Sequence, residues 1–146
     1  MRGSIIISEE LRSLPRIAER MEENKAFLLN PLVLAFVGDG VQTLCVRTAL
    51  ARSSDAKAGE LHKACVKKIK AVNQSVMSER IVPVLTEREA DVFRRARNAK
   101  MPTVAKHASL TEYRYATAFE AVIGYLYLIG EDDRLAYLLS VAEGEE

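Results

Sequence analysis

Two long apolar stretches of this 146-residue chain constrain its fold most strongly, because each contains a single charged residue. Residues 31–46 contain only Asp39, and residues 115–130 contain only Glu120. Helices that are apolar nearly all round are typical of the buried centre of a protein. We therefore expect two central helices, each of which carries one carboxylate into or beside the core.

A buried carboxylate must be paired, hydrogen-bonded, protonated or bound to a metal ion, because burying its charge alone is unfavourable. One interpretation is structural, with each acid paired to a core-facing arginine such as Arg47 or Arg114. The other is a pocket in which Asp39 and Glu120 converge and bind Mg²⁺, an ion that prefers carboxylates and retained water molecules. The residue pattern alone leaves both interpretations open.

Two glycines flank Asp39, within the sequence FVGDGVQTL at residues 36–44. Inside a helix, Gly38 and Gly40 each cost about 1 kcal/mol relative to alanine. That cost suggests that something bulky approaches the backbone here. It could be another helix, a ligand or a nucleic-acid strand.

The rest of the chain predicts helices and no alternating strand. Asn30 before Pro31 is a helix start, and two capping boxes, Thr86 with Glu89 and Ser109 with Glu112, precede further helices. We expect helices over residues 31–52, 60–82, 90–100 and 113–128 and around 132–142, together with a short amphipathic helix over 9–23 that is bent near Pro15. Residues 53–59 and 101–109 are expected to be loops.

The composition is that of a globular protein, with 49% hydrophobic and 28% charged residues. We expect an all-α fold with one domain over residues 1–146, a core at about 28–142 and an N-terminal extension at 1–25. Cys45 and Cys65 lack the spacing of a zinc site and are expected to be buried, reduced thiols. The longest apolar run, residues 121–129, is short for a membrane span. We expect a cytoplasmic protein with no membrane partner.

The net charge of +1 argues against a uniformly basic nucleic-acid-binding protein. Basic residues nevertheless concentrate in residues 45–115, which contain 15 Lys and Arg against 7 Asp and Glu. This segment either faces phosphates or forms an ordinary solvated surface.

Several motifs together resemble those of a known family. LAFVGDGV (34–41) resembles the ribonuclease III signature, whose usual form is close to L-E-F-L-G-D-S. TAFEAVIGYLYL (117–128) resembles that family's second motif, D-x-x-E-A-[LI]-[IL]-G-x-x-[FY]-L. With LHK (61–63), RNAK (97–100) and YRYATAFEA (113–121), the set is most similar to the compact Mini-ribonuclease III subfamily. The resemblance covers residues 34–128.

The resemblance implies a helical bundle like the ribonuclease III endonuclease domain, which forms a homodimer and cleaves double-stranded RNA with Mg²⁺ to leave 5′-phosphate ends. Asp39 and Glu120 fall on the catalytic, metal-binding aspartate and glutamate of the family. Ala35 and Thr117 stand where two further family acids would be, as in Mini-ribonucleases III. Each site therefore has fewer carboxylates than in full-length relatives, and the number of metal ions stays open.

Full-length ribonucleases III carry a separate domain for double-stranded RNA, and after Gly130 we expect only one short helix in this chain. The catalytic domain itself would then bind RNA, mainly through phosphates and 2′-hydroxyls. The candidate RNA-binding residues are Arg94, Arg95, Arg97, Asn98, Lys100, Lys106 and Arg114. Each of them could also belong to a solvated surface.

The function implied by the resemblance is maturation of the 23S ribosomal RNA precursor. One alternative is a catalytically silent protein of the ribonuclease III fold that binds ribosomal RNA or acts as a structural partner. Ala35 and Thr117 favour that alternative, whereas Asp39 and Glu120 disfavour it. An unrelated helical interaction domain would require accidental motif matches. His62 is expected to be a hydrogen-bonded structural residue rather than a catalyst.

Overall fold

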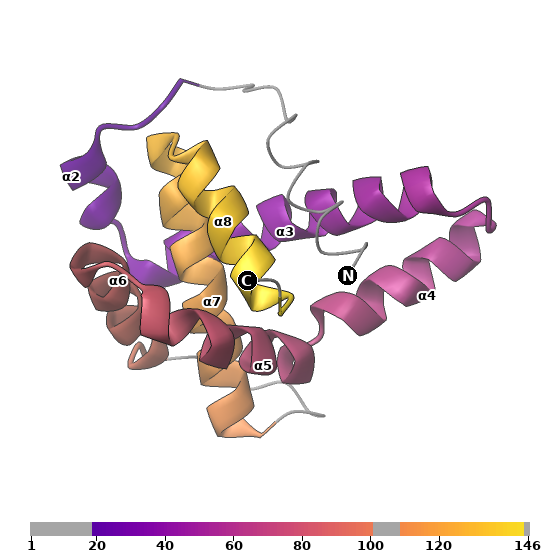
Figure 1. Ribbon diagram of the computed structural model, residues 1–146. Coiled ribbons are helices and arrows are strands. Elements are labelled where there is room, and N and C mark those ends of the chain that lie inside the picture. The colour runs from indigo at the N-terminus through magenta and orange to yellow at the C-terminus, as the bar shows by residue number, and fades with distance from the viewer. Residues whose placement is uncertain (1–18, 101–108, 145–146) are drawn as a thin grey trace.

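The computed structural model describes residues 19–100 and 109–144. Within these ranges the chain is helical and forms no strand, which confirms the all-α prediction. The helices, shown in Figure 1, are α2 (Glu23–Phe27), α3 (Pro31–Ser53), α4 (Ala58–Ile69), α5 (Ala71–Ile81), α6 (Glu87–Arg97), α7 (Leu110–Ile129) and α8 (Asp132–Ala142), with a 3₁₀ turn, η1 (Val82–Val84), before α6.

The two apolar stretches form α3 and α7, which pack against each other at the centre of the fold. Their backbones meet at two glycines. A β-carbon on Gly38 would lie 1.8 Å from the carbonyl oxygen of Glu120, and one on Gly124 would lie 1.9 Å from that of Leu34. The bulky neighbour expected near Gly38 is therefore the other helix. Gly40 faces open space within the described protomer.

Local sequence signals set the starts of the helices as expected. The side chain of Asn30 caps α3 by accepting a hydrogen bond from the backbone of its first turn, at 2.8 Å. Both predicted capping boxes are present, Thr86 with Glu89 at α6 and Ser109 with Glu112 at α7. These caps satisfy backbone N–H groups that have no partner inside the helix.

The expected continuous helix over residues 60–82 is wrong. The backbone becomes extended at Lys70, with ψ 158°, and this separates α4 from α5. Asn73 compensates for the break, because its Nδ2 donates to the carbonyl oxygen of Lys67 at 2.6 Å. The break allows α4 to pack beside α3 while α5 packs on α7 and α8, as Figure 1 shows. Neither glycine nor proline marks this position in the sequence.

By length and composition, α3 is apolar enough to cross a membrane, unlike the short run considered above. One such helix is weak evidence for a membrane, because a core helix has the same composition. Its packing on α7 accounts for the buried ones, such as Leu34, Val41 and Cys45, while Val33, Phe36 and Leu44 stay exposed. Cys45 on α3 and Cys65 on α4 are buried thiols that form no disulfide, as expected.

The segment before α3 packs on the end of α7. The backbone N–H of Met21 donates to the carbonyl oxygen of Leu128 at 2.7 Å, and Ala26 in α2 is fully buried. Most of the amphipathic helix expected over residues 9–23 lies outside the described residues.

Candidate active site

Asp39 on α3 and Glu120 on α7 converge in one open pocket. Its lining residues are Leu32, Ala35, Phe36, Asp39, Tyr113, Thr117 and Glu120. Asp39 is exposed and Glu120 is partly buried, so both acids lie beside the core rather than inside it. The structure thus brings together the two residues that the sequence suggested for metal binding and catalysis.

The crossing of the two helices explains this convergence. Gly38 directly precedes Asp39, and the backbone atom that approaches Gly38 belongs to Glu120. Ala35 is four residues before Asp39 and Thr117 is three before Glu120, so each pair shares a face of its helix. The positions of the two missing family acids therefore line the same pocket.

The protonation of Glu120 depends on its burial and on Asp39. Burial, followed by the charge and the side chain of Asp39, raises the pKa of Glu120 to about 8. A hydrogen bond from Gln74 acts in the opposite direction. Repulsion between two acids in one pocket is relieved when a cation binds between them.

The ion-pair interpretation of the two acids is wrong for the described part of the chain. None of its Lys, Arg or His side chains forms an ion pair with Asp39 or Glu120. The Arg114 guanidinium instead donates to the carbonyl oxygens of Arg97, at 2.9 Å, and Ala99, at 3.5 Å.

The pocket has the chemistry of a site for a divalent cation. Its carboxylates are the hard oxygen ligands that Mg²⁺ prefers, and its open side leaves room for water and substrate oxygens. The structure, across residues 19–100 and 109–144, contains no group of three or more His, Cys, Asp and Glu that could hold a metal. Among the described residues, Asp39 and Glu120 would therefore supply the charged ligands. The Thr117 hydroxyl donates its proton to the carbonyl oxygen of Tyr113 at 2.9 Å. It could therefore offer a metal ion or a water molecule only an oxygen lone pair.

Three of the candidate RNA-binding residues are exposed at the C-terminal end of α6, namely Arg94, Asn98 and Lys100. Arg94 is paired with Asp91 on the same helix. Arg97 is half-buried, and its Nε donates to the Asn98 side chain at 3.2 Å. Lys106 lies outside the described residues.

Two other candidates make contacts that support the fold. Arg95 donates to the carbonyl oxygen of Phe27 at 2.7 Å, and its guanidinium lies 4.7 Å from the centre of the Phe27 ring. Arg114 connects α7 to the end of α6 through the carbonyl bonds described above. These contacts use one guanidinium nitrogen of each arginine, and RNA binding by either residue stays a prediction.

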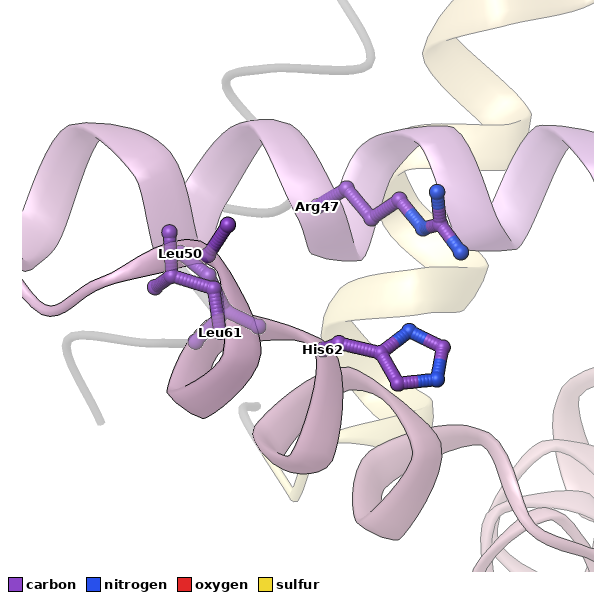
Figure 2. Close-up of a pocket in the computed structure, with 5 residues that line it drawn as sticks. Arg47, Leu50, Leu61 and His62 are labelled. Carbon is purple, nitrogen blue, oxygen red and sulfur yellow. The ribbon is translucent and has the colours of Figure 1, made fainter.

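His62 lies away from the two carboxylates. Figure 2 shows Arg47 of α3 and His62 of α4 pointing the same way beside a pocket that Leu50, Ala58 and Leu61 also line. His62 is exposed and makes no hydrogen bond with a described residue. It therefore lacks the hydrogen-bonded setting expected of a structural histidine.

The sequence analysis missed two amides beside the pocket. Gln74 on α5 donates to Glu120, and Gln42 on α3 accepts from Gln74. A glutamine three residues after Asp39 in an otherwise apolar helix was the available signal for Gln42. Nothing local in the sequence connected Gln74 to Glu120.

The sequence pattern of the Ribonuclease III domain matches residues 32–131. The chain belongs to the ribonuclease III family. It is 44% identical over 122 residues to Mini-ribonuclease 3 of Brevibacillus brevis, with 81% of this chain and 91% of the relative covered. It is 45% identical over 114 residues to Mini-ribonuclease 3 of Clostridium tetani, with 77% and 76% covered.

A solved structure shares the fold. The crystal structure of a Fusobacterium nucleatum protein superposes on this ribonuclease III-family chain with a TM-score of 0.73 and 28% identity, covering 80% of this chain and 93% of the other. The resemblance found in the motifs is thereby confirmed, and the chain is an endoribonuclease of the Mini-ribonuclease 3 type.

Proposed function

We propose that this endoribonuclease cleaves double-stranded or structured RNA in a Mg²⁺-dependent reaction centred on Asp39 and Glu120. The observation that carries the proposal is the meeting of two carboxylates from different helices in one open pocket. Neither acid has an ion-pair partner among the described side chains. Neither acid is therefore tied up in a salt bridge, so both can serve as ligands of a cation. Enzymes of this family generally depend on divalent metal ions and act on double-stranded RNA.

The roles of the residues follow from their exposure. Asp39 is exposed and would bind the ion directly, while the partly buried Glu120 would bind it directly or through water. The ion, when bound, supplies an activated water and offsets charge on the phosphate. Cleavage would leave 5′-phosphate and 3′-hydroxyl ends.

We also propose that the enzyme is a homodimer whose interface includes one face of α3. Val33, Phe36 and Leu44 lie on that face with exposed fractions of 45%, 80% and 47%. Gly40 lies among them and faces open space in the protomer, which would let a partner's backbone approach closely. An apolar face of this kind favours an isologous contact. Because Phe36 also lines the pocket, such a dimer would hold two active sites near its interface.

The RNA would bind along the exposed end of α6. Arg94, Arg97, Asn98 and Lys100 supply polar and basic groups there. Arg114 fixes this end beside the first half of α7, the half that contributes Tyr113 to the pocket. Contacts to phosphates at this place would align a duplex with the two carboxylates.

We propose the 23S ribosomal RNA precursor as the natural substrate and the cytoplasm as the location. Family membership supports both proposals. The Mini-ribonuclease 3 relatives are similar over most of their own length.

The experiment that tests the proposed function incubates the protein with long double-stranded RNA and with 23S precursor, in Mg²⁺ or in EDTA. We expect cuts at defined positions with 5′-phosphate ends in Mg²⁺ and intact RNA in EDTA. A folded protein that leaves both RNAs intact in Mg²⁺ would contradict the proposal and favour a silent RNA-binding protein.

A further inference from the structure

Two glutamine side chains are buried where α3, α5 and α7 meet. Gln42 lies on α3 and Gln74 on α5, and each is only 3% exposed. Buried amides are unfavourable unless they are hydrogen-bonded, so each has to find partners inside the protein. One of these partners is Glu120 of the active site.

The amide nitrogen of Gln74 donates two hydrogen bonds. One goes to Oε1 of Gln42 at 2.6 Å, and the other goes to Oε2 of Glu120 at 3.2 Å. An amide nitrogen carries two hydrogens, so both are used. A carboxylate that binds a cation is ionised and can only accept, which requires the amino side of Gln74 to face it.

The bond to Gln42 fixes the direction of the bond to Glu120. Gln42 lies three residues after Asp39 on α3, and its carbonyl oxygen holds the Gln74 amide from that side. Gln74 therefore connects the two helices that supply the carboxylates. Gln74 thereby holds Oε2 of Glu120.

A neutral donor suits this position. An arginine or lysine at position 74 would pair with Glu120 and cancel the charge that attracts a divalent cation. An apolar side chain would leave the carboxylate free to rotate. The amide holds an oxygen and adds no charge of its own to the pocket. Orientation has added weight here because Ala35 and Thr117 supply no carboxylate.

We propose that Gln74, held by Gln42, is a positioning residue that orients the Glu120 carboxylate so that Glu120 and Asp39 bind one divalent cation together. The inference rests on the proposed metal-dependent cleavage and extends it to α5, which carries no acid of the site.

The test uses the full chain with Gln74→Met and with the double variant Gln42→Met/Gln74→Met. Methionine keeps the unbranched shape of glutamine. The double variant removes donor and acceptor together, so it leaves no orphaned amide and keeps the fold even where the single variant does not. Mn²⁺ affinity is measured by calorimetry without RNA, and kcat and KM are measured on double-stranded RNA in Mg²⁺.

We expect both variants to lose at least about tenfold in Mn²⁺ affinity and in kcat, because partners that orient metal ligands have effects of about 10- to 100-fold. KM for RNA should stay unchanged, since neither glutamine is exposed. Ser78→Ala is the matched control. Ser78 is fully buried one turn further along α5 and donates to the Ser75 carbonyl oxygen at 2.8 Å. This control should keep wild-type Mn²⁺ affinity and kcat.

A folded double variant with wild-type Mn²⁺ affinity and kcat would overturn the positioning role. An equal loss in Ser78→Ala would also overturn it, because the effect would then come from general disturbance of α5. In both cases cleavage by the wild type would still uphold the proposed function. A wild type that neither binds Mn²⁺ nor cleaves RNA would overturn both proposals.

Discussion

Glu89 is buried, yet both of its carboxylate oxygens have strong donors. Arg134 donates to them at 2.9 and 2.8 Å, and the backbone N–H of Thr86 donates at 2.9 Å. Burial, the largest influence, opposes ionisation, but the bonds from Arg134 and Thr86 outweigh it and lower the pKa of Glu89. The charge of Glu89 thus stabilises the fold through Arg134. Asp39 and Glu120, by contrast, have no cationic partner among the described residues.

Glu89→Gln should therefore destabilise the protein at neutral pH, by about 2 kcal/mol for the lost charged hydrogen bonds. The folded pKa lies below the unfolded value of about 4.3, so the contribution is present above that value and is lost as the pH falls through the folded pKa. Urea unfolding at pH 7 and pH 3 measures the difference between wild type and variant. A difference of the same size at both values would contradict this role.

The sequence indicated Asp39 and Glu120 because each is the single charge in an apolar helix. It could not indicate their amide partners, since Gln74 reaches Glu120 across 46 residues of chain through packing of α5 on α7. The same limit explains Arg95 and Arg114. Their basic character predicted phosphate contacts, which stay untested, but it could not indicate the backbone carbonyls that tertiary packing brings to them.

At the level of helices, the crossing of α3 and α7 depends on Gly38. Gly38→Ala would place a β-carbon 1.8 Å from the Glu120 carbonyl oxygen, so the helices must separate. We expect a loss of about 3 kcal/mol in the free energy of unfolding, at the upper end for overpacking. Gly59→Ala, whose β-carbon enters open space on α4, is the control and should be neutral or stabilising by up to about 1 kcal/mol. Equal stability of the two variants in urea would show that the crossing is not tightly packed.

The break between α4 and α5 shows what helical periodicity cannot predict. Apolar spacing continues through residues 60–82, but α4 pairs with α3 while α5 pairs with α7 and α8. Two partners in different directions require a change of direction at Lys70, and Asn73 satisfies the freed carbonyl. Caps and starts, by contrast, depend on neighbouring residues, and the expected ones at Asn30, Thr86 and Ser109 are all present.

The exposed end of α6 is where we expect RNA phosphates. Lys100→Glu should weaken binding of double-stranded RNA and reduce the slope of log K against log salt by about 1, as for one lost phosphate contact. Lys25→Glu is the control, because Lys25 is exposed on α2 at the opposite end of α7. Binding is measured without divalent cations so that the RNA stays intact. An unchanged slope for Lys100→Glu would remove this residue from the RNA contact.

For the whole molecule, the exposed face of α3 should decide the oligomeric state. Phe36→Lys places a charge in the middle of that face and should give monomers in analytical ultracentrifugation. Leu28→Lys changes a side chain of similar exposure, 77%, that lies outside α3. This control should stay dimeric. A dimeric Phe36→Lys protein would place the interface elsewhere.

The decisive measurement is the rate at which wild type and Asp39→Asn cleave a long double-stranded RNA in Mg²⁺. Asp39 is exposed and stands beside Glu120, so the variant should fold and, without metal, be at least as stable as the wild type. When both proteins are saturated with RNA, we predict that the cleavage rate of Asp39→Asn is lower by more than about 100-fold. This exceeds the effect of residues that only support a metal ligand. Wild-type cleavage by folded Asp39→Asn would contradict the assignment of the reaction to this pocket.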